Sequence, residues 1–322
     1  MLSIAGDVVM IDIKKVLFTT DFSSSAQQAF SHALFLAEHH NVELHLLNVI
    51  QTHRHDMIEP MEQAGNAEMI YKQLCDNAEG RLRDMAEEKS NGITVHPEAV
   101  CGINIVQSIL EYITTHDIDV VVMGTHGRHG VNRWIMGSIS EKIVRLAPCS
   151  VITIHGDRTI DTHNPLKNIL VPIDFSEYSR KALRTAIDIA GTYGSELHVL
   201  HVIEKMNIPS VYGVEKSGFE KRIDEVKERA TIEAERLIRE FGGDNVRSHV
   251  HIVRGHATRT IISFADELSP DLVVIATHGL KGIEYLLIGS VTEKVVRFVQ
   301  SPVLTVKSKS VIKYLEEQKK SA

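Results

Sequence analysis

Short apolar runs alternate with amphipathic stretches along the whole chain. Residues 120–123 are apolar at every position, which is typical of a strand buried on both faces of a parallel sheet. Residues 26–37 instead place Ala26, Ala29, Phe30, Ala33 and Ala37 at helical spacing, which predicts a helix with one buried face. Because strand and helix patterns alternate in this way, the sequence predicts an α/β fold.

The pattern occurs twice. Residues 15–21 are matched by residues 168–174, and residues 120–141 by residues 273–293, at offsets of 152 or 153. We therefore expect two tandem doubly wound domains, at 1–158 and 159–322, each a five-stranded parallel sheet with helices on both faces. A chain of 322 residues suits two domains of ordinary size.

Within each half, the second strands are expected at 42–50 and 196–203. Long polar loops should follow at 51–67 and 204–218, with helices over roughly 68–88 and 219–241. The last helices are expected to begin near Ser140 and Thr292. Pro97 has no N–H to give to a neighbouring strand, so the third strand of the first half should lie at an edge.

Glycines follow the apolar run at Gly124, Gly127 and Gly137, and a serine, Ser138, comes directly after the last of them. Glycine admits positive φ and lets a ligand approach bare N–H groups. Ser138 and Glu141 have the S-x-x-E spacing of a capping box that opens a helix. A helix start beyond the carboxyl end of a parallel strand is an anion site, so the stretch predicts a phosphate cradle.

The second half repeats the stretch with one change. Gly279, Gly289 and Ser290 correspond to Gly127, Gly137 and Ser138, but Ala276 stands where the first glycine should be. A β-carbon there is expected to crowd a ligand or to forbid a positive φ. The first-half site is thus expected to be the more intact one. The alternative is that these glycines only make tight turns from strand to helix.

Asp21 and Asp174 each end a first strand and are each followed by Phe-Ser. Two interpretations stay open. The acids contact a ligand in the crevice, or they merely support the start of the next helix, whose cap is expected at Ser23 or Ser176.

The composition argues against several classes of function. A formal charge of −7 and a pI near 6.2 give no basic footprint for nucleic acid, and no run is long enough to span a bilayer. Three cysteines without CxxC spacing suit a reducing, cytoplasmic setting and are expected to be core filling or chance. The 18 histidines include His53 and His55, but the spacing completes no metal shell, so no metal ligand is expected among the side chains.

Taken together, Asp21-Phe-Ser23 and the G-x2-G-x9-G-S spacing from Gly124 to Ser138, recurring in the second half, resemble the universal stress protein family. The resemblance covers about 15–154 and 168–306. It implies a sheet order of 3-2-1-4-5 in each domain, and pairing of domains through their last strands. In the members that bind ATP, the first-strand acid and the second-strand backbone hold adenosine, and the glycine motif holds ribose and phosphates.

Carried onto this sequence, the resemblance implies two sets of cofactor-binding positions. They are Asp21, Val49, Gly124, Gly127, Gly137, Ser138 and Ile139 in the first half, and Asp174, Val202, Gly279, Gly289, Ser290 and Val291 in the second. The expected cofactor is ATP, AMP or ADP, with Mg²⁺ on the phosphates. No Gly-Lys-[ST] follows the glycines, so no catalytic residue is assigned and at most slow, incidental ATP hydrolysis is expected.

The function expected from the resemblance is nucleotide-linked regulation of a stress response. The alternative is a dimeric interaction protein that binds no nucleotide. We expect the two halves to pair within the chain through residues 151–154 and 303–306, and whole chains to form homodimers, without a membrane or nucleic acid as partner.

Overall fold

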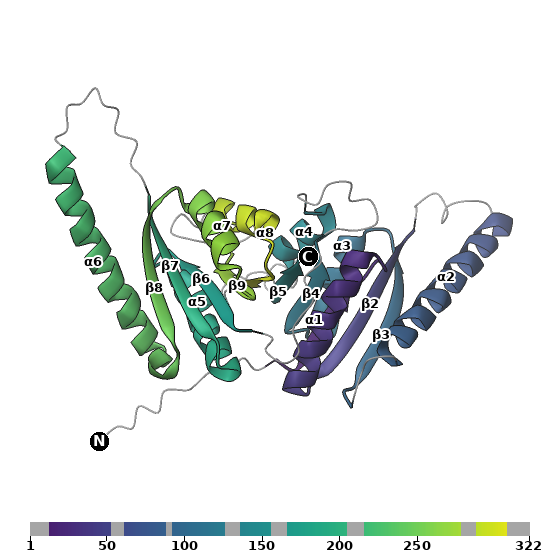
Figure 1. Ribbon diagram of the computed structural model, residues 1–322. Coiled ribbons are helices and arrows are strands. Elements are labelled where there is room, and N and C mark those ends of the chain that lie inside the picture. The colour runs from purple at the N-terminus through teal and green to yellow at the C-terminus, as the bar shows by residue number, and fades with distance from the viewer. Residues whose placement is uncertain are drawn as a thin grey trace, which may run out of the picture. The chain divides into compact units, whose positions relative to one another are not determined.

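The computed structural model describes residues 13–52, 61–87, 92–125, 136–155, 166–204, 216–277 and 288–307. The chain divides into two compact units, whose described parts lie within 13–155 and 166–307. Each unit is an α/β structure built on five strands (Figure 1).

The first unit alternates strands and helices from its first strand to its last. Its elements are β1 (Lys15–Thr19), α1 (Ser24–His40), β2 (Glu43–Gln51), α2 (Met61–Glu87), β3 (Val95–Gly102), α3 (Ile105–Thr115), β4 (Val120–Gly124), α4 (Ser138–Leu146) and β5 (Ser150–Ile154). The strands pair in parallel in the order β3-β2-β1-β4-β5. This is the 3-2-1-4-5 order implied by the resemblance.

The second unit repeats this order of elements, and a short 3-10 turn follows its second helix. Its elements are β6 (Asn168–Ile173), α5 (Glu177–Tyr193), β7 (Glu196–Glu204), α6 (Lys216–Glu240), the 3-10 turn η3 (Gly243–Asn245), β8 (Ser248–Gly255), α7 (Ala257–Leu268), β9 (Leu272–Ala276), α8 (Ser290–Phe298) and β10 (Val303–Val306). Its strands follow the order β8-β7-β6-β9-β10, and every recorded pair is parallel.

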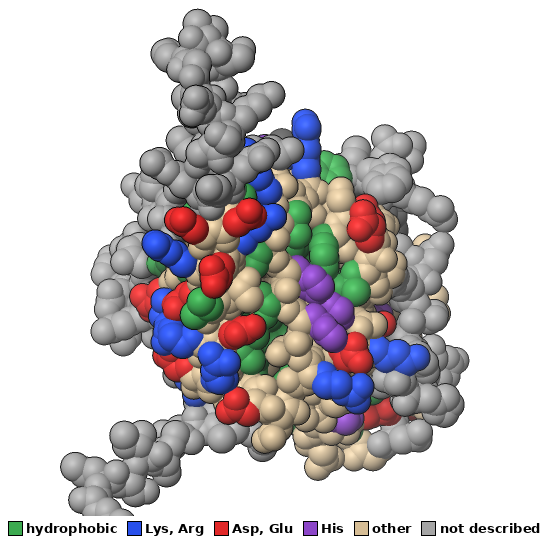
Figure 2. All heavy atoms as spheres, turned by 60° about the vertical axis from the view of Figure 1, so that its left-hand side comes forward, with side chains coloured by type: hydrophobic (Ala, Val, Ile, Leu, Met, Phe, Trp, Pro, Cys, Tyr) green, Lys and Arg blue, Asp and Glu red, His purple; other side chains and the backbone are tan. Residues whose placement is uncertain are grey.

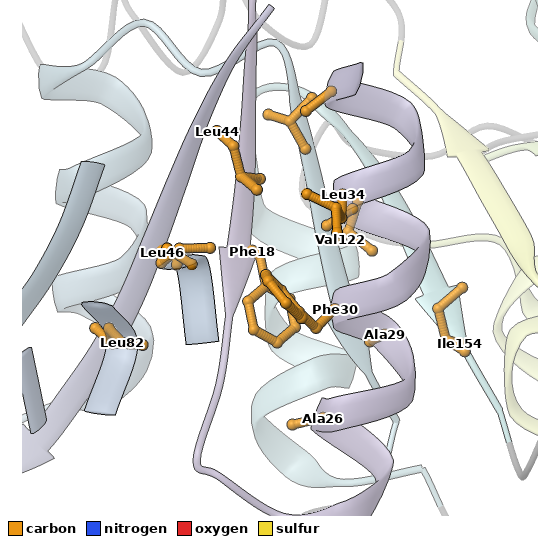
Figure 3. Close-up of a cluster of buried hydrophobic side chains, with 14 of the residues drawn as sticks. Phe18, Ala26, Ala29, Phe30, Leu34, Leu44, Leu46, Leu82, Val122 and Ile154 are labelled. Atoms are coloured by element: carbon orange, nitrogen blue, oxygen red, sulfur yellow. The ribbon is translucent and has the colours of Figure 1, made fainter. Parts of the chain in front are cut away.

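The sheet of the first unit is covered on both faces. Phe18 and other residues of one face pack with α1 and with Leu82 of α2 in one apolar cluster, in which the rings of Phe18 and Phe30 lie 5.4 Å apart (Figure 3). Leu17, which points to the opposite face, is also fully buried, and α3 packs against α4 on that side. Burial on both faces explains why these strands are apolar at nearly every position.

Most predicted elements are confirmed, and the differences lie at helix starts. α2 and α6 begin at Met61 and Lys216, several residues before the predicted starts, because their first turns lack the apolar periodicity by which a helix is recognised. α4 and α8 begin at Ser138 and Ser290, two residues earlier than predicted. β3, which contains Pro97, lies at an edge of its unit's sheet, as predicted.

None of the described helices is long and apolar enough to cross a membrane.

Candidate functional site

The turn after the first strand of each unit is built on an aspartate. The N–H of Ser23 donates to Asp21 Oδ1 at 3.0 Å, and the N–H of Ser176 donates to Asp174 Oδ1 at the same distance. Both serines then cap a helix as predicted, since Ser23 Oγ accepts from Ala26 N and Ser176 Oγ accepts from Ser179 N. Each aspartate therefore supports the helix start, and its position at the carboxyl end of a strand also leaves it at the proposed crevice.

The phenylalanine inside this turn has a conformation that the sequence did not reveal. Phe22 has φ = 62° and Phe175 has φ = 63°, in the left-handed region that bulky residues rarely adopt. The Phe22 N–H donates to Thr20 Oγ1, and the Arg81 guanidinium lies 3.8 Å from the centroid of the Phe22 ring. Strained residues of this kind cluster at functional sites, and this one recurs at the same place in both units.

The second strand holds the end of the first strand in place beside it. Asn48 Nδ2 donates to the carbonyl oxygen of Thr20 at 2.8 Å, and His201 Nδ1 contacts the carbonyl of Ile173 at 2.9 Å in the second unit. Val49 and Val202 follow directly and are half-buried. The predicted adenosine-binding backbone thus lies next to the aspartate turn in each unit.

The first turn of α4 differs from the predicted capping box. Gly137, not Ser138, is the N-cap, with φ = −64° and ψ = 148°, and as a glycine it makes no side-chain cap hydrogen bond. Gly289 caps α8 in the same way. The capping box predicted from the S-x-x-E spacing is wrong, because Ser138 is the first helical residue and not the residue before the helix. Gly137 has no side chain with which to cap the first N–H groups of α4, and Ser138 is exposed beside them.

A hydroxyl two residues further on ties the helix to the strand that precedes it. Ser140 Oγ donates to the carbonyl oxygen of Gly124 at 3.0 Å, and Thr292 Oγ1 donates to that of Ala276 at 2.7 Å. The N–H of Gly137 donates to Thr125 O at 2.7 Å. Sequence reasoning missed these bonds, although a hydroxyl residue recurs at this place in both halves. They fix the uncapped helix start at the carboxyl end of the strand.

Gly124 has a packing role that was not predicted. It is not among the described residues with positive φ, so the expectation based on φ is wrong for this position. A Cβ on Gly124 would lie 3.1 Å from the carbonyl oxygen of Ser25, in the first turn of α1. The glycine therefore lets α1 approach β4 closely. Ala276, its counterpart, is buried, so the change to alanine bears on packing under the helix.

A cavity of about 150 Å³ lies at the carboxyl end of β1, between α1 and α2. Its lining comprises Thr20, Phe22, Ser23, Gln27, Arg81 and Met85. Pockets that enclose a whole small-molecule ligand usually measure about 300–1,000 Å³, so this cavity can take only part of a nucleotide.

Of the predicted binding positions, Gly127 and Gly279 lie outside the described residues. In each unit the structure brings the aspartate turn, the end of the second strand and the start of the last helix to the same edge of the sheet. This edge is where ligands bind in open α/β sheets.

The model of the universal stress protein family matches residues 12–155 and 165–307. Over 145 residues the chain is 30% identical to a universal stress protein of Methanocaldococcus jannaschii, which covers 45% of this chain and 84% of that protein. It is 31% identical over 193 residues to one of Mycobacterium tuberculosis, covering 59% of this chain and 62% of that protein.

Solved structures show the same fold. A putative universal stress protein of Pseudomonas aeruginosa matches with a TM-score of 0.68 and 21% identity, over 96% of this chain and 98% of that one. One of Archaeoglobus fulgidus matches with a TM-score of 0.61 and 20% identity, over 91% and 96%. With both halves matched by the family, the chain belongs to the universal stress proteins and is a tandem member of that family.

Proposed function

We propose that the first unit binds an adenine nucleotide, ATP in the first place, and that occupancy regulates a stress response. The observation that carries the proposal is the start of α4. Gly137 caps this helix without a side chain, and Ser138 is exposed beside the N–H groups of its first turn.

The physical basis is the attraction of an anion to a helix start. The N–H groups of the first turn point out of the helix, and the helix dipole adds a partial positive charge there. Phosphate oxygens accept such bonds from the backbone of Ser138 and Ile139 and from the Ser138 hydroxyl. Asp21 and the backbone at Val49 would then hold the adenosine, and Mg²⁺ would bind to the phosphates.

We extend the proposal to the second unit. Gly289 caps α8 with nearly the same backbone angles as Gly137, and Thr292 repeats the bond of Ser140. Because Ala276 is buried, its methyl group is no argument against a ligand at Ser290 and Val291. The role proposed for both sites is binding, with turnover slow at most, and phosphate release measured under saturating ATP tests that part.

A proline at the first helical position gives a sharp test. Proline is favoured there, and Gly137 already has the extended conformation that a following proline requires, so Ser138→Pro should fold. The variant removes one N–H and one hydroxyl. Charge-assisted hydrogen bonds contribute about 1.5–3 kcal/mol, so we expect Kd for ATP at the first site to rise roughly 10–100-fold.

The chain supplies its own matched control. Ser290→Pro makes the same change in the second unit, where Gly289 has φ = −61° and ψ = 142°. It should weaken the second site and leave the first as it is. Ser138→Ala separates the hydroxyl from the N–H. If Ser138→Pro binds ATP as tightly as the unmodified chain, the phosphates do not lie at this helix start.

Mass spectrometry of protein purified without added nucleotide separates the proposal from the alternative of an interaction protein. A co-purified adenine nucleotide, lost in the double variant Ser138→Pro/Ser290→Pro, supports nucleotide binding. Absence of nucleotide together with absence of heat on ATP titration supports the interaction protein.

We further propose that the two units pair through β5 and β10. Each is the last strand of its unit, and an edge strand left uncovered invites pairing with other chains. Small-angle scattering should show one compact particle per chain. A distribution typical of two independent bodies on a linker would contradict the pairing, and the same data report whether whole chains form homodimers.

A further inference from the structure

Two histidines and a glutamate meet at the amino ends of β2 and β3, at the opposite edge of the sheet from the nucleotide crevice. Glu43 and His45 are two residues apart on β2 and so point to the same face. His96 on β3 is the direct partner of His45 in the strand register. The Glu43 Oε2 atom lies 3.5 Å from His96 Nε2 and 3.7 Å from His45 Nε2.

His45 is almost fully buried, with 4% of its surface exposed, and within the described part of the chain its Nε2 has no hydrogen-bond partner. Its other nitrogen, Nδ1, lies 3.0 Å from the hydroxyl of Tyr112 on α3. Tyr112 is in turn hydrogen-bonded to the carboxylate of Glu98. The hydroxyl thus donates to Glu98 and accepts the proton of His45 Nδ1.

This chain of bonds leaves a bare lone pair on Nε2. A neutral imidazole carries one proton, and that proton is held at Nδ1. The ring of His45 is buried, and its centroid lies 4.7 Å from that of His96 and 5.5 Å from that of His116. Two acceptors, His45 Nε2 and the Glu43 carboxylate, therefore face each other with no proton between them, and a cation placed there would satisfy both.

The same three residues recur in the second unit as Glu196, His198 and His249, each 153 positions later. His198 and His249 are again direct partners in the strand register, and Glu196 Oε2 lies 3.4 Å from His249 Nε2. In the view of Figure 2, histidine side chains gather on one face of the molecule beside acidic and basic ones.

We propose that Glu43, His45 and His96 form a Zn²⁺ site. Two imidazole nitrogens and one carboxylate oxygen are a donor set that Zn²⁺ favours, and with three protein ligands the fourth position stays open for water. At bond lengths of 2.0–2.1 Å the ligand atoms of a tetrahedral site lie about 3.3–3.4 Å apart. The recorded separations from Glu43 need to shorten by only a few tenths of an ångström, and the His96 side chain is half exposed.

The bonds around His45 suit it as a ligand. A histidine that binds a metal almost always donates its other N–H to a second group, which fixes the ring and the tautomer. Tyr112, backed by Glu98, fills that place. The geometry before metal binding thus already matches the arrangement after it.

The second copy is less ready to bind. His198 Nδ1 lies 3.1 Å from His251 Nε2, and His198 Nε2 lies 3.3 Å from Asn168 Oδ1, so both nitrogens are engaged. Arg247 also binds Glu196 Oε1 at 3.2 Å. A metal there must first displace one of these contacts, and we assign the tighter site to the first unit.

Calorimetric titration of the full chain with ZnCl₂, after removal of bound metal by EDTA and gel filtration, tests the site. We expect saturable binding of Zn²⁺ to one class of tight sites, called the tight class below. His96→Gln should raise the Kd for Zn²⁺ at the tight class by roughly 10–100-fold or more. Mutation of a group that only hydrogen-bonds to a metal ligand already lowers metal affinity by roughly 10–100-fold. The matched variant His249→Gln should leave the tight class unchanged. Because His96 is half exposed, His96→Gln should fold, and the melting temperature in EDTA checks this.

Glu43→Gln provides a second variant that keeps the side-chain size and removes the charge, again at a half-exposed position. It should weaken the tight class as His96→Gln does, and Mg²⁺ should not compete with Zn²⁺. X-ray absorption of the zinc-loaded chain should show nitrogen or oxygen neighbours at about 2.0–2.1 Å. Absence of saturable zinc binding, an unchanged tight class in His96→Gln, or sulfur neighbours at about 2.3 Å would each overturn the site.

Discussion

The hydroxyl of Ser140 donates to the carbonyl oxygen of Gly124 across the proposed nucleotide site, at 3.0 Å. This bond ties the start of α4 to the end of β4, and Thr292 and Ala276 repeat it in the second unit. An anion site made of backbone N–H groups depends on the helix start staying where the strand ends. The bond therefore links the stability of the fold to the preorganisation of the site.

We expect Ser140→Ala to lower the free energy of local unfolding around α4 by about 1 kcal/mol, the usual net contribution of one hydrogen bond. Affinity for ATP at the first site should fall with it. Hydrogen exchange followed by mass spectrometry measures this, because it reports on each unit separately. A single unfolding curve would not give a well-defined free energy for a protein of two units. Thr292→Val is the matched change in α8. Unchanged protection of α4 in Ser140→Ala would show that the bond contributes nothing.

Exchanging the residues at the ends of β4 and β9 tests the packing role of Gly124. In Gly124→Ala the added Cβ meets Ser25 O at 3.1 Å, so α1 must shift and we expect a loss of about 1–3 kcal/mol. Ala276→Gly removes a buried methyl group and should cost about 1 kcal/mol. Hydrogen exchange in α1 and α5 measures both changes. A neutral Gly124→Ala would mean that the close approach of α1 is not required.

The serine caps of α1 and α5 should contribute similar amounts to the stability of their helices. Ser23→Ala and Ser176→Ala each remove the acceptor for an N–H of the first turn, and such changes cost about 1 kcal/mol. Faster exchange should be confined to the first turn of the helix concerned and to the aspartate turn before it. Equal acceleration throughout the unit would indicate a global loss of stability instead of a lost cap.

The cysteines were expected to be core filling or chance; only Cys149 is buried, while Cys75 on α2 and Cys101 on β3 lie outside the core. Their sulfur atoms lie 2.8 Å apart, and Cys101 is exposed. We expect hydrogen peroxide to join them in a disulfide, each thiol giving up a hydrogen as the peroxide is reduced to water. Burial, the bond to Cys101 and nearby charges raise the pKa of Cys75 to about 12, so thiolate from this residue is scarce at neutral pH.

The rate of disulfide formation should therefore rise as pH increases, because the thiolate is the reactive form. Peptide mapping without reductant measures the product, and Cys149, being buried, should stay reduced. Cys75→Ser is the control, in which Cys101 can form only sulfenic or higher acids. Finding those acids at Cys101 in the unmodified chain, with no disulfide, would contradict the expectation.

The duplicated pattern explains why so much of the fold could be predicted. Strands buried on both faces are apolar throughout, and each boundary could be checked against a second copy 152 or 153 residues away. The caps at Ser23 and Ser176 were predictable because a serine directly precedes each apolar helix pattern. The start of α4 was not, since S-x-x-E spacing is the same whether serine precedes the helix or begins it.

The sites were harder to predict than the fold, because they depend on backbone conformation and on which residues pair between strands. The turn at Phe22 requires a positive φ, which a phenylalanine in the sequence does not predict. The zinc proposal depends on His96, which is far from His45 in sequence and becomes its neighbour only through the pairing of β2 with β3. The repeated Glu-x-His at 43–45 and 196–198 was the available signal, and it has meaning only once the strand register is known.

Calorimetric titration of the full chain with ATP and Mg²⁺ tests the central claim most directly. The account predicts saturable heat from a tight ATP site, whose Kd rises roughly 10–100-fold in Ser138→Pro and stays unchanged in Ser290→Pro. Absence of any saturable heat up to millimolar ATP, in protein shown to carry no nucleotide beforehand, would contradict it.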